Sequence, residues 1–141
     1  MKWRRKVNKK DLGVLGENYA TNYLKNNKFN ILERNFRFSR FGEIDIIASE
    51  NDYICFIEVK TRSGKLFGMP SESVNINKQK KIKMLAQIYL KGKGMLNRNV
   101  RFDVMEVFLE YTNKSYSNDN IGSNADSYIR VKEINLIRNA F

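Results

Sequence analysis

The sequence predicts a single α/β domain in which a mixed β-sheet is flanked by helices. The chain has 141 residues, enough for one domain with a hydrophobic core of its own. Two segments place apolar residues at helical spacing, and five have the composition and alternation of strands. They follow one another in the order α-β-β-β-α-β-β, which favours helices packed against a mixed sheet.

The first predicted helix follows a flexible basic arm at residues 1–10 and ends near residues 26–28. Asp11 is its expected N-cap. Gly13 and Gly16 weaken the helix locally, which indicates that another element packs closely against it. The apolar positions that recur at helical spacing are Leu12, Leu15, Tyr19, Tyr23 and Leu24.

The second helix is expected at about residues 77–91, with four lysines covering its first turns. Its apolar stripe consists of Ile82, Leu85, Ala86, Tyr89 and Leu90. Residues 112–127 are polar and predict a long mobile loop, and residues 11–141 are predicted to form one domain. The strands are expected at residues 29–38, 43–48, 53–61, 101–111 and 128–137.

Several classes of protein are excluded by composition. Histidine is absent, so Ser-His-Asp and Cys-His catalysis and His-ligated zinc are excluded. Cys55 is the only cysteine, which precludes an intramolecular disulfide and favours a cytoplasmic setting. Cys55 is expected to be a buried, inert thiol. Neither a membrane span nor a signal peptide is predicted.

The net charge of +11 arises from 26 Lys and Arg residues against 15 Asp and Glu residues. So large an excess in a short chain predicts a polyanionic partner, and nucleic acid is the natural candidate. A lysine-rich composition that only maintains solubility is the alternative. The clustering of the basic residues favours nucleic acid.

Two neighbouring predicted strands carry acidic residues between apolar ones. Alternation puts Glu43 and Asp45 on one face of the second strand. Ile44 and Ile46 are expected on the opposite face. Because strands this apolar are usually interior, the carboxylates need a counter-charge or a metal ion.

The third strand supplies Glu58 and Lys60, which alternation places on a common face. A tight turn between the two strands would bring both residues close to Asp45. Two carboxylates can hold Mg²⁺ or Mn²⁺, and the lysine can assist an attacking water or stabilise charge on a phosphate. A structural ion pair between Lys60 and one of the carboxylates is the alternative.

Basic residues near these strands are candidates for contact with phosphates. Such contacts set affinity rather than sequence choice, and no helix-turn-helix or zinc finger is recognisable. For the helix lysines, a solvated face is an equally good interpretation. Phe36, Phe38 and Phe41 either stack on unpaired bases or pack in the core. The candidate phosphate contacts are Arg62, Lys65, Lys78, Lys80, Lys81 and Lys83.

The motifs resemble those of the YraN-like family of small bacterial proteins, from Leu12 to the C-terminus. The matching segments are Gly16-Glu17, Arg34-Asn35-Phe36-Arg37, Gly42-Glu43-Ile44-Asp45-Ile46-Ile47-Ala48, Phe56-Ile57-Glu58-Val59-Lys60-Thr61-Arg62, Gly68-Met69-Pro70 with Ser73-Val74, Lys78, Ala86 with Tyr89-Leu90, and Arg101-Phe102-Asp103-Val104.

That resemblance implies the restriction-endonuclease-like fold of the PD-(D/E)xK nucleases, close to archaeal Holliday-junction resolvases. It implies that Asp45, Glu58 and Lys60 are the motif residues. Glu17 would complete the catalytic and metal-binding set, and Glu43 would be a secondary ligand. Ile44 departs from the motif, which has proline before the aspartate.

The expected function is therefore a Mg²⁺- or Mn²⁺-dependent endonuclease acting on DNA, including branched or structured DNA. A homodimer is a further expectation, drawn from the resolvase-like relatives. The alternatives are a non-catalytic nucleic-acid-binding module in a repair or recombination assembly, and a basic protein of an RNA-associated assembly.

Overall fold

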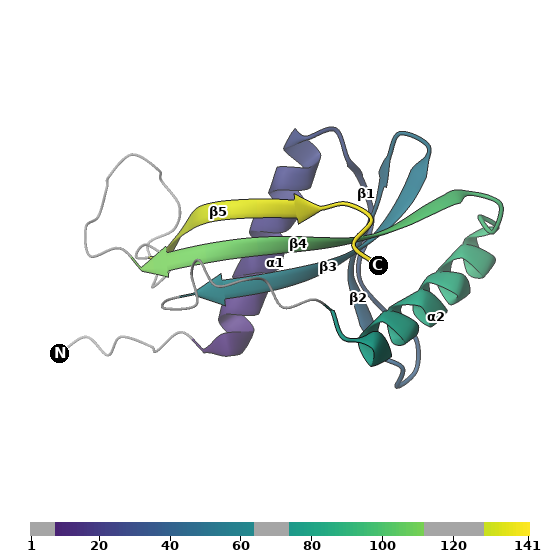
Figure 1. The fold of residues 1–141 in the computed structure, drawn as a ribbon, viewed down its shortest axis with the longest axis horizontal. Helices are drawn as coiled ribbons and strands as arrows, with labels where there is room; N and C mark the ends of the chain where they lie inside the picture. Colours follow the sequence, from purple (N-terminus) through teal and green to yellow (C-terminus); the bar gives the residue numbers. More distant parts are fainter. Residues whose placement is uncertain (1–7, 64–73, 112–128) are drawn as a thin grey trace.

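The computed structural model describes residues 8–63, 74–111 and 129–141. Within them the chain forms one five-stranded sheet and two helices, in the predicted order α-β-β-β-α-β-β (Figure 1). The predicted restriction-endonuclease-like α/β class is confirmed. The elements are α1 (Lys9–Asn26), β1 (Asn30–Arg37), β2 (Glu43–Glu50), β3 (Tyr53–Ser63), α2 (Ile76–Lys93), β4 (Asn99–Tyr111) and β5 (Ile129–Ile137).

The sheet is mixed, because one pair of neighbouring strands is parallel and the other pairs are antiparallel. Strands follow the spatial order β1-β2-β3-β4-β5. β1, β2 and β3 are antiparallel neighbours, β3 and β4 are parallel, and β5 returns antiparallel to β4. α2 connects the two parallel strands, as a parallel pair requires. The sheet can therefore be covered by helices on both faces.

Two hydrophobic clusters occupy the two faces of the sheet. α1 buries Ala20 and Leu24 on one face, against alternate β3 residues such as Cys55 and Ile57. The opposite face packs against α2, whose buried residues are the predicted stripe of Ile82, Leu85, Ala86, Tyr89 and Leu90. Figure 1 shows α1 crossing the sheet, with α2 on the other side of β2. Because a helix covers each face of the sheet, β3 is apolar on both faces, and its sequence is a nearly continuous apolar run.

The first helix begins earlier than predicted. Asn8, not Asp11, is the N-cap, and its side chain accepts a hydrogen bond of 2.8 Å from the backbone N–H of Asp11. Lys9 and Lys10 therefore belong to α1 rather than to the predicted arm. Asn is as good an N-cap as Asp, so the correction follows from ordinary capping preference. Residues 1–7 of the predicted arm, and the predicted loop at residues 112–127, lie outside the described residues.

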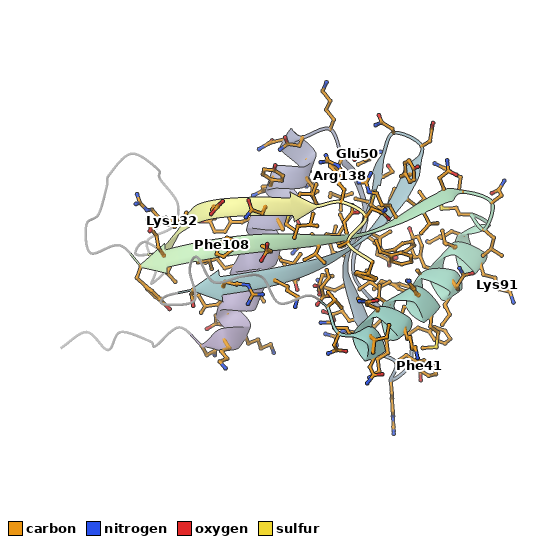
Figure 2. All side chains as sticks on the ribbon, in the orientation of Figure 1. Phe41, Glu50, Lys91, Phe108, Lys132 and Arg138 are labelled. Carbon is orange, nitrogen blue, oxygen red and sulfur yellow. The ribbon has the colours of Figure 1, made fainter. Side chains whose placement is uncertain are left out.

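A buried ionic network ties the C-terminal residues to the sheet. Asp103 is fully buried, pairs with Arg101 at 2.8 Å and accepts a 2.9 Å hydrogen bond from the backbone N–H of Asn139. Arg101 pairs with Glu50. Arg138 also pairs with Glu50, and Figure 2 shows these two residues next to each other. Each charged residue of this network has a partner of opposite charge. Arg101 and Asp103 of the Arg101-Phe102-Asp103-Val104 motif therefore have a structural role.

Cys55 is fully buried, as expected for an inert thiol. Burial raises its pKa to about 11, so it stays protonated at neutral pH. Neither helix in the described part of the chain combines the length and apolar character needed to cross a membrane.

Gly16 allows α1 to approach β3 closely, next to the candidate site residue Glu17. A Cβ at Gly16 would lie 1.9 Å from Oγ1 of Thr61, which is too close for any side chain. A Cβ at Gly13, one turn earlier, would meet no neighbouring atom within 4 Å. The close packing predicted from the two glycines is therefore present at Gly16 alone.

Gly16→Ala is expected to destabilise the protein by about 1–3 kcal/mol, because α1 must move away from β3. Gly13→Ala is the matched control, and it should stabilise by about 0.5–1 kcal/mol because alanine is the better helix former. Urea denaturation of both variants measures the difference. Equal effects of the two substitutions would contradict the close contact.

Candidate functional site

The candidate site forms where the pairing of β2 with β3 ends. The paired residues run from Glu50–Tyr53 to Ile46–Ile57, and Asp45 and Glu58 are the next residues beyond the last pair. Asp45 turns toward β3, where its Oδ2 accepts a 2.8 Å hydrogen bond from the backbone N–H of Val59. The Asp45 carboxylate thus accepts a backbone N–H that a neighbouring strand would otherwise accept, and this hydrogen bond fixes the position of the carboxylate.

At this point the regular alternation of side chains between the two faces of the sheet is interrupted in both β1 and β2. Unbroken alternation had been assumed in the prediction from the sequence. Ile44 packs in the α2-side cluster and Ile46 in the α1-side cluster, so the prediction that they share a face was wrong. Their partners in β1, Phe36 and Arg34, also face α2 and α1 respectively. Asn35 lies between them with φ of 54°, a left-handed conformation that Asn tolerates.

Glu17, Glu43 and Asp45 form what we call the acid cluster. One carboxylate oxygen from each lies within 4.8 Å of the others. Asn35 joins the cluster from β1: with its amide nitrogen facing the carboxylates it donates to Oε2 of Glu17 at 3.1 Å and to Oε1 of Glu43 at 3.2 Å. Three oxygen ligands at this spacing match the preference of Mg²⁺ and Mn²⁺.

Glu58 approaches the same place from β3 and has a counter-charge of its own. Its side chain is 6% exposed, and Oε1 accepts a hydrogen bond from the ammonium of Lys78. Lys78 lies in the first turn of α2, where the Asn75 cap accepts its backbone N–H at 2.9 Å. The cap and the ion pair together fix the start of α2 over Glu58.

Burial and electrostatic repulsion raise the pKa values of Asp45 and Glu17. Burial raises the pKa of Asp45 to about 8, and the nearby charges of Glu58 and Glu17 act in the same direction, against the hydrogen bond from Val59. Burial also raises the pKa of Glu17, helped by Glu43. Asp45 therefore retains its proton near neutral pH in the absence of a cation.

The pKa of Lys78 is also raised, which for a lysine favours the charged form. Burial lowers its pKa, but the hydrogen bond and charge of Glu58, followed by the charges of Asp45 and Glu43, outweigh burial and give a net rise. The ammonium is therefore charged over the whole neutral range. The sequence predicted Lys78 as a nucleic-acid contact and left its ion pair with Glu58 unpredicted, because the two residues are 20 positions apart.

Lys60 follows Glu58 on β3 and is partly buried. Its register partner on β4 is Glu106, whose carboxylate lies 3.6 Å from Nε of Arg62. Strand alternation puts Lys60 on the face of Glu58, but Lys60 is not among the described residues that line the cleft below. Its catalytic role stays a prediction.

A cleft of about 570 Å³ opens onto this site. Asp45, Glu43 and Glu58 lie on its sheet side, and Lys78 and Lys81 lie on its α2 side. Other residues that line it are Arg40, Phe41, Gly42, Asn75, Ile76, Asn77, Ile82 and Leu85. The structure thus brings Asp45 and Glu58 to one cleft, and Glu17 reaches Asp45 from α1 through the acid cluster.

The predicted phosphate contacts occupy different surroundings. Lys80 and Lys81 are exposed on α2. The Lys83 ammonium lies 5.6 Å from the ring centre of Phe102, a cation–π contact. Arg62 is 15% exposed and faces a buried carboxylate, and Lys65 lies outside the described residues. Contact of these residues with nucleic acid stays a prediction.

Comparison with known proteins gives consistent matches. Residues 16–107 match the family model described as "Uncharacterised protein family UPF0102". A UPF0102 protein of Acetivibrio thermocellus is 49% identical over 136 residues, covering 96% of this chain and 95% of that protein. A UPF0102 protein of Clostridium botulinum strain 657 is 47% identical over 133 residues, 94% of each chain. One of Dictyoglomus turgidum is 48% identical over 103 residues, 73% of this chain and 86% of that one.

The acid cluster should make stability depend on pH. Between about pH 4, where an unfolded aspartate titrates, and the folded value of about 8, the folded chain holds a proton at Asp45 that the unfolded chain has released. Wild-type stability should therefore fall as pH rises through this range. Asp45→Asn should remove this loss and be more stable than wild type by at least about 1 kcal/mol at the alkaline end.

Urea denaturation in EDTA at several pH values measures this difference. Asp52→Asn, in the exposed turn between β2 and β3, is the matched control and should follow the wild type. If Asp45→Asn is destabilising at every pH, the carboxylates do not repel one another as described.

Proposed function

This chain belongs to the UPF0102 family, as its YraN-like motifs predicted, and we propose that it is a metal-dependent endonuclease that cleaves phosphodiester bonds in DNA. The single observation that carries the proposal is the meeting of Asp45 and Glu58 at the end of the β2–β3 pairing. Glu17 approaches Asp45 from α1, and the ammonium of Lys78 is paired with Glu58.

The residues suit a hard divalent cation. Asp45, Glu58 and Glu17 would hold Mg²⁺ or Mn²⁺, with Glu43 as a further ligand, because these ions prefer carboxylate oxygens. Burial first, and repulsion between the acids second, raise the pKa values of Asp45 and Glu17, and a bound cation would offset both costs. When bound, such an ion polarises a phosphate and lowers the pKa of a coordinated water.

The chain's own groups then have separate tasks. The Val59 N–H orients Asp45, and Lys78 orients Glu58 from α2. Lys60 is proposed to position the attacking water or to stabilise charge on the phosphate as the bond breaks. The exposed lysines of α2, with the net charge of +11, would attract the polyanionic backbone of DNA in the cytoplasm.

A second candidate function is non-catalytic binding of nucleic acid, and one observation favours it. Glu58 is already neutralised by Lys78, so this carboxylate is stable without a metal ion. A protein of this kind would bind structured DNA in Mn²⁺ and yield no product even at enzyme concentrations near those of the substrate.

Asp45→Asn and Glu58→Gln should each lower Mn²⁺-dependent cleavage of DNA by at least about 100-fold, since each removes a charged ligand. A gel assay with duplex, flap, single-stranded and four-way DNA measures the rate. Asp52→Asn, an exposed control, should retain full activity. Undiminished cleavage by Asp45→Asn would refute the assignment.

Lys60→Ala and Lys78→Ala should have different effects. Lys60→Ala is expected to lower kcat about 100-fold with little change in Mn²⁺ affinity, because its amine acts on the reacting groups. Lys78→Ala removes a positive charge bound to Glu58, so Mn²⁺ should bind several-fold more tightly. Calorimetric titration gives the affinities. If Mn²⁺ affinity falls in Lys78→Ala, the lysine supports the metal site rather than competing with it.

A further inference from the structure

Two phenylalanines at the β1–β2 turn remain exposed beside the cleft. Phe38 is 47% exposed and Phe41 is 45% exposed. Their rings are parallel within 5°, with centres 6.4 Å apart. Phe36, two residues earlier, instead packs edge-on against Tyr89 in the α2-side core. Of these three rings, which the sequence left undecided between core and stacking, only Phe36 packs against the core.

The backbone of the turn holds the two rings together. The N–H of Phe41 donates to the carbonyl of Phe38 at 3.3 Å, and Ser39 has φ of 53°. Gly42 follows with φ of 114°, a conformation that side chains rarely adopt. The chain therefore accepts two positive-φ residues in a short turn that presents two large apolar rings to solvent, which folding alone does not require.

The position of the turn links the rings to the candidate site. Arg40 and Phe41 line the same cleft as Asp45 and Glu58. Figure 2 shows Phe41 at the edge of the molecule, beside the beginning of α2. Phe41 is therefore placed where it can contact a strand of nucleic acid whose phosphate reaches the carboxylates.

The charges around the rings select the type of ligand. Arg40 is exposed next to Phe41, and Lys81 lies on the α2 side of the cleft. Aromatic rings with adjacent cations are the combination that binds single-stranded nucleic acid, because rings stack on bases while cations contact phosphates. Bases inside a duplex are already stacked and present no free face to Phe38 or Phe41.

We propose that residues 38–42 are a stacking platform that binds unpaired bases next to the acid cluster, so that the preferred substrate is DNA with unpaired bases. This rests on the proposed function for the choice of DNA and specifies its substrate class. Charged neighbours, Arg37 and Arg40 among them, make the surface less suited to an apolar protein partner.

Binding without metal tests the platform independently of cleavage. Fluorescence anisotropy in EDTA, at fixed ionic strength, compares a blunt duplex with the same duplex bearing a single-stranded tail. Phe38→Ala and Phe41→Ala should each weaken binding to the tailed DNA by about 10-fold and change binding to the blunt duplex by less than about 2-fold. Tyr111→Ala, which removes an exposed ring at the end of β4, is the matched control and should change neither.

A spectroscopic readout separates stacking from a general loss of structure. In a Trp3→Phe background, Phe41→Trp should bind tailed DNA like the wild type, and its emission should be quenched by tailed DNA and not by the blunt duplex. Unchanged binding by both alanine variants, or equal losses on the two DNAs, would overturn the proposal. Because no metal is present, absence of cleavage in Mn²⁺ would contradict the nuclease function and leave these binding results standing.

Discussion

The site depends on one structural constraint, which is the early end of the hydrogen-bonded pairing between β2 and β3. Beyond Ile46–Ile57 the strands no longer bond to each other, and the Asp45 carboxylate accepts the N–H of Val59. Because the side chain lies between the strands, acids from both layers can approach it. Glu17 comes from α1, and Glu58 faces α2.

Bringing these acids together opposes stability, and the surrounding residues partly offset the repulsion. Asn35 donates to two carboxylates of the acid cluster, and Lys78 neutralises Glu58. The Asp45 carboxylate accepts a hydrogen bond from the backbone N–H of Val59, and burial raises its pKa to about 8. Ionisable groups whose pKa the fold shifts away from the value in water are characteristic of functional sites.

Most of the architecture could be predicted from the sequence because it follows from local periodicity. The five apolar positions of α2 repeat at helical spacing and are all buried. The acids could be placed near one another because a short turn joins β2 to β3. The change of face at Asn35 was not predictable from alternation, since it depends on a positive φ within a strand. The role of Lys78 was also missed, because pairing between residues 20 positions apart leaves no local pattern.

The central claim is that a divalent cation occupies the place where Asp45 and Glu58 meet. Anomalous diffraction from crystals soaked in Mn²⁺ is the decisive experiment. We expect a single strong peak within bonding distance of oxygens of Asp45 and Glu58, with Glu17 or Glu43 completing the ligands. A peak elsewhere on the protein, with Lys78 still bound to Glu58 and no ion between the strands, would contradict the claim.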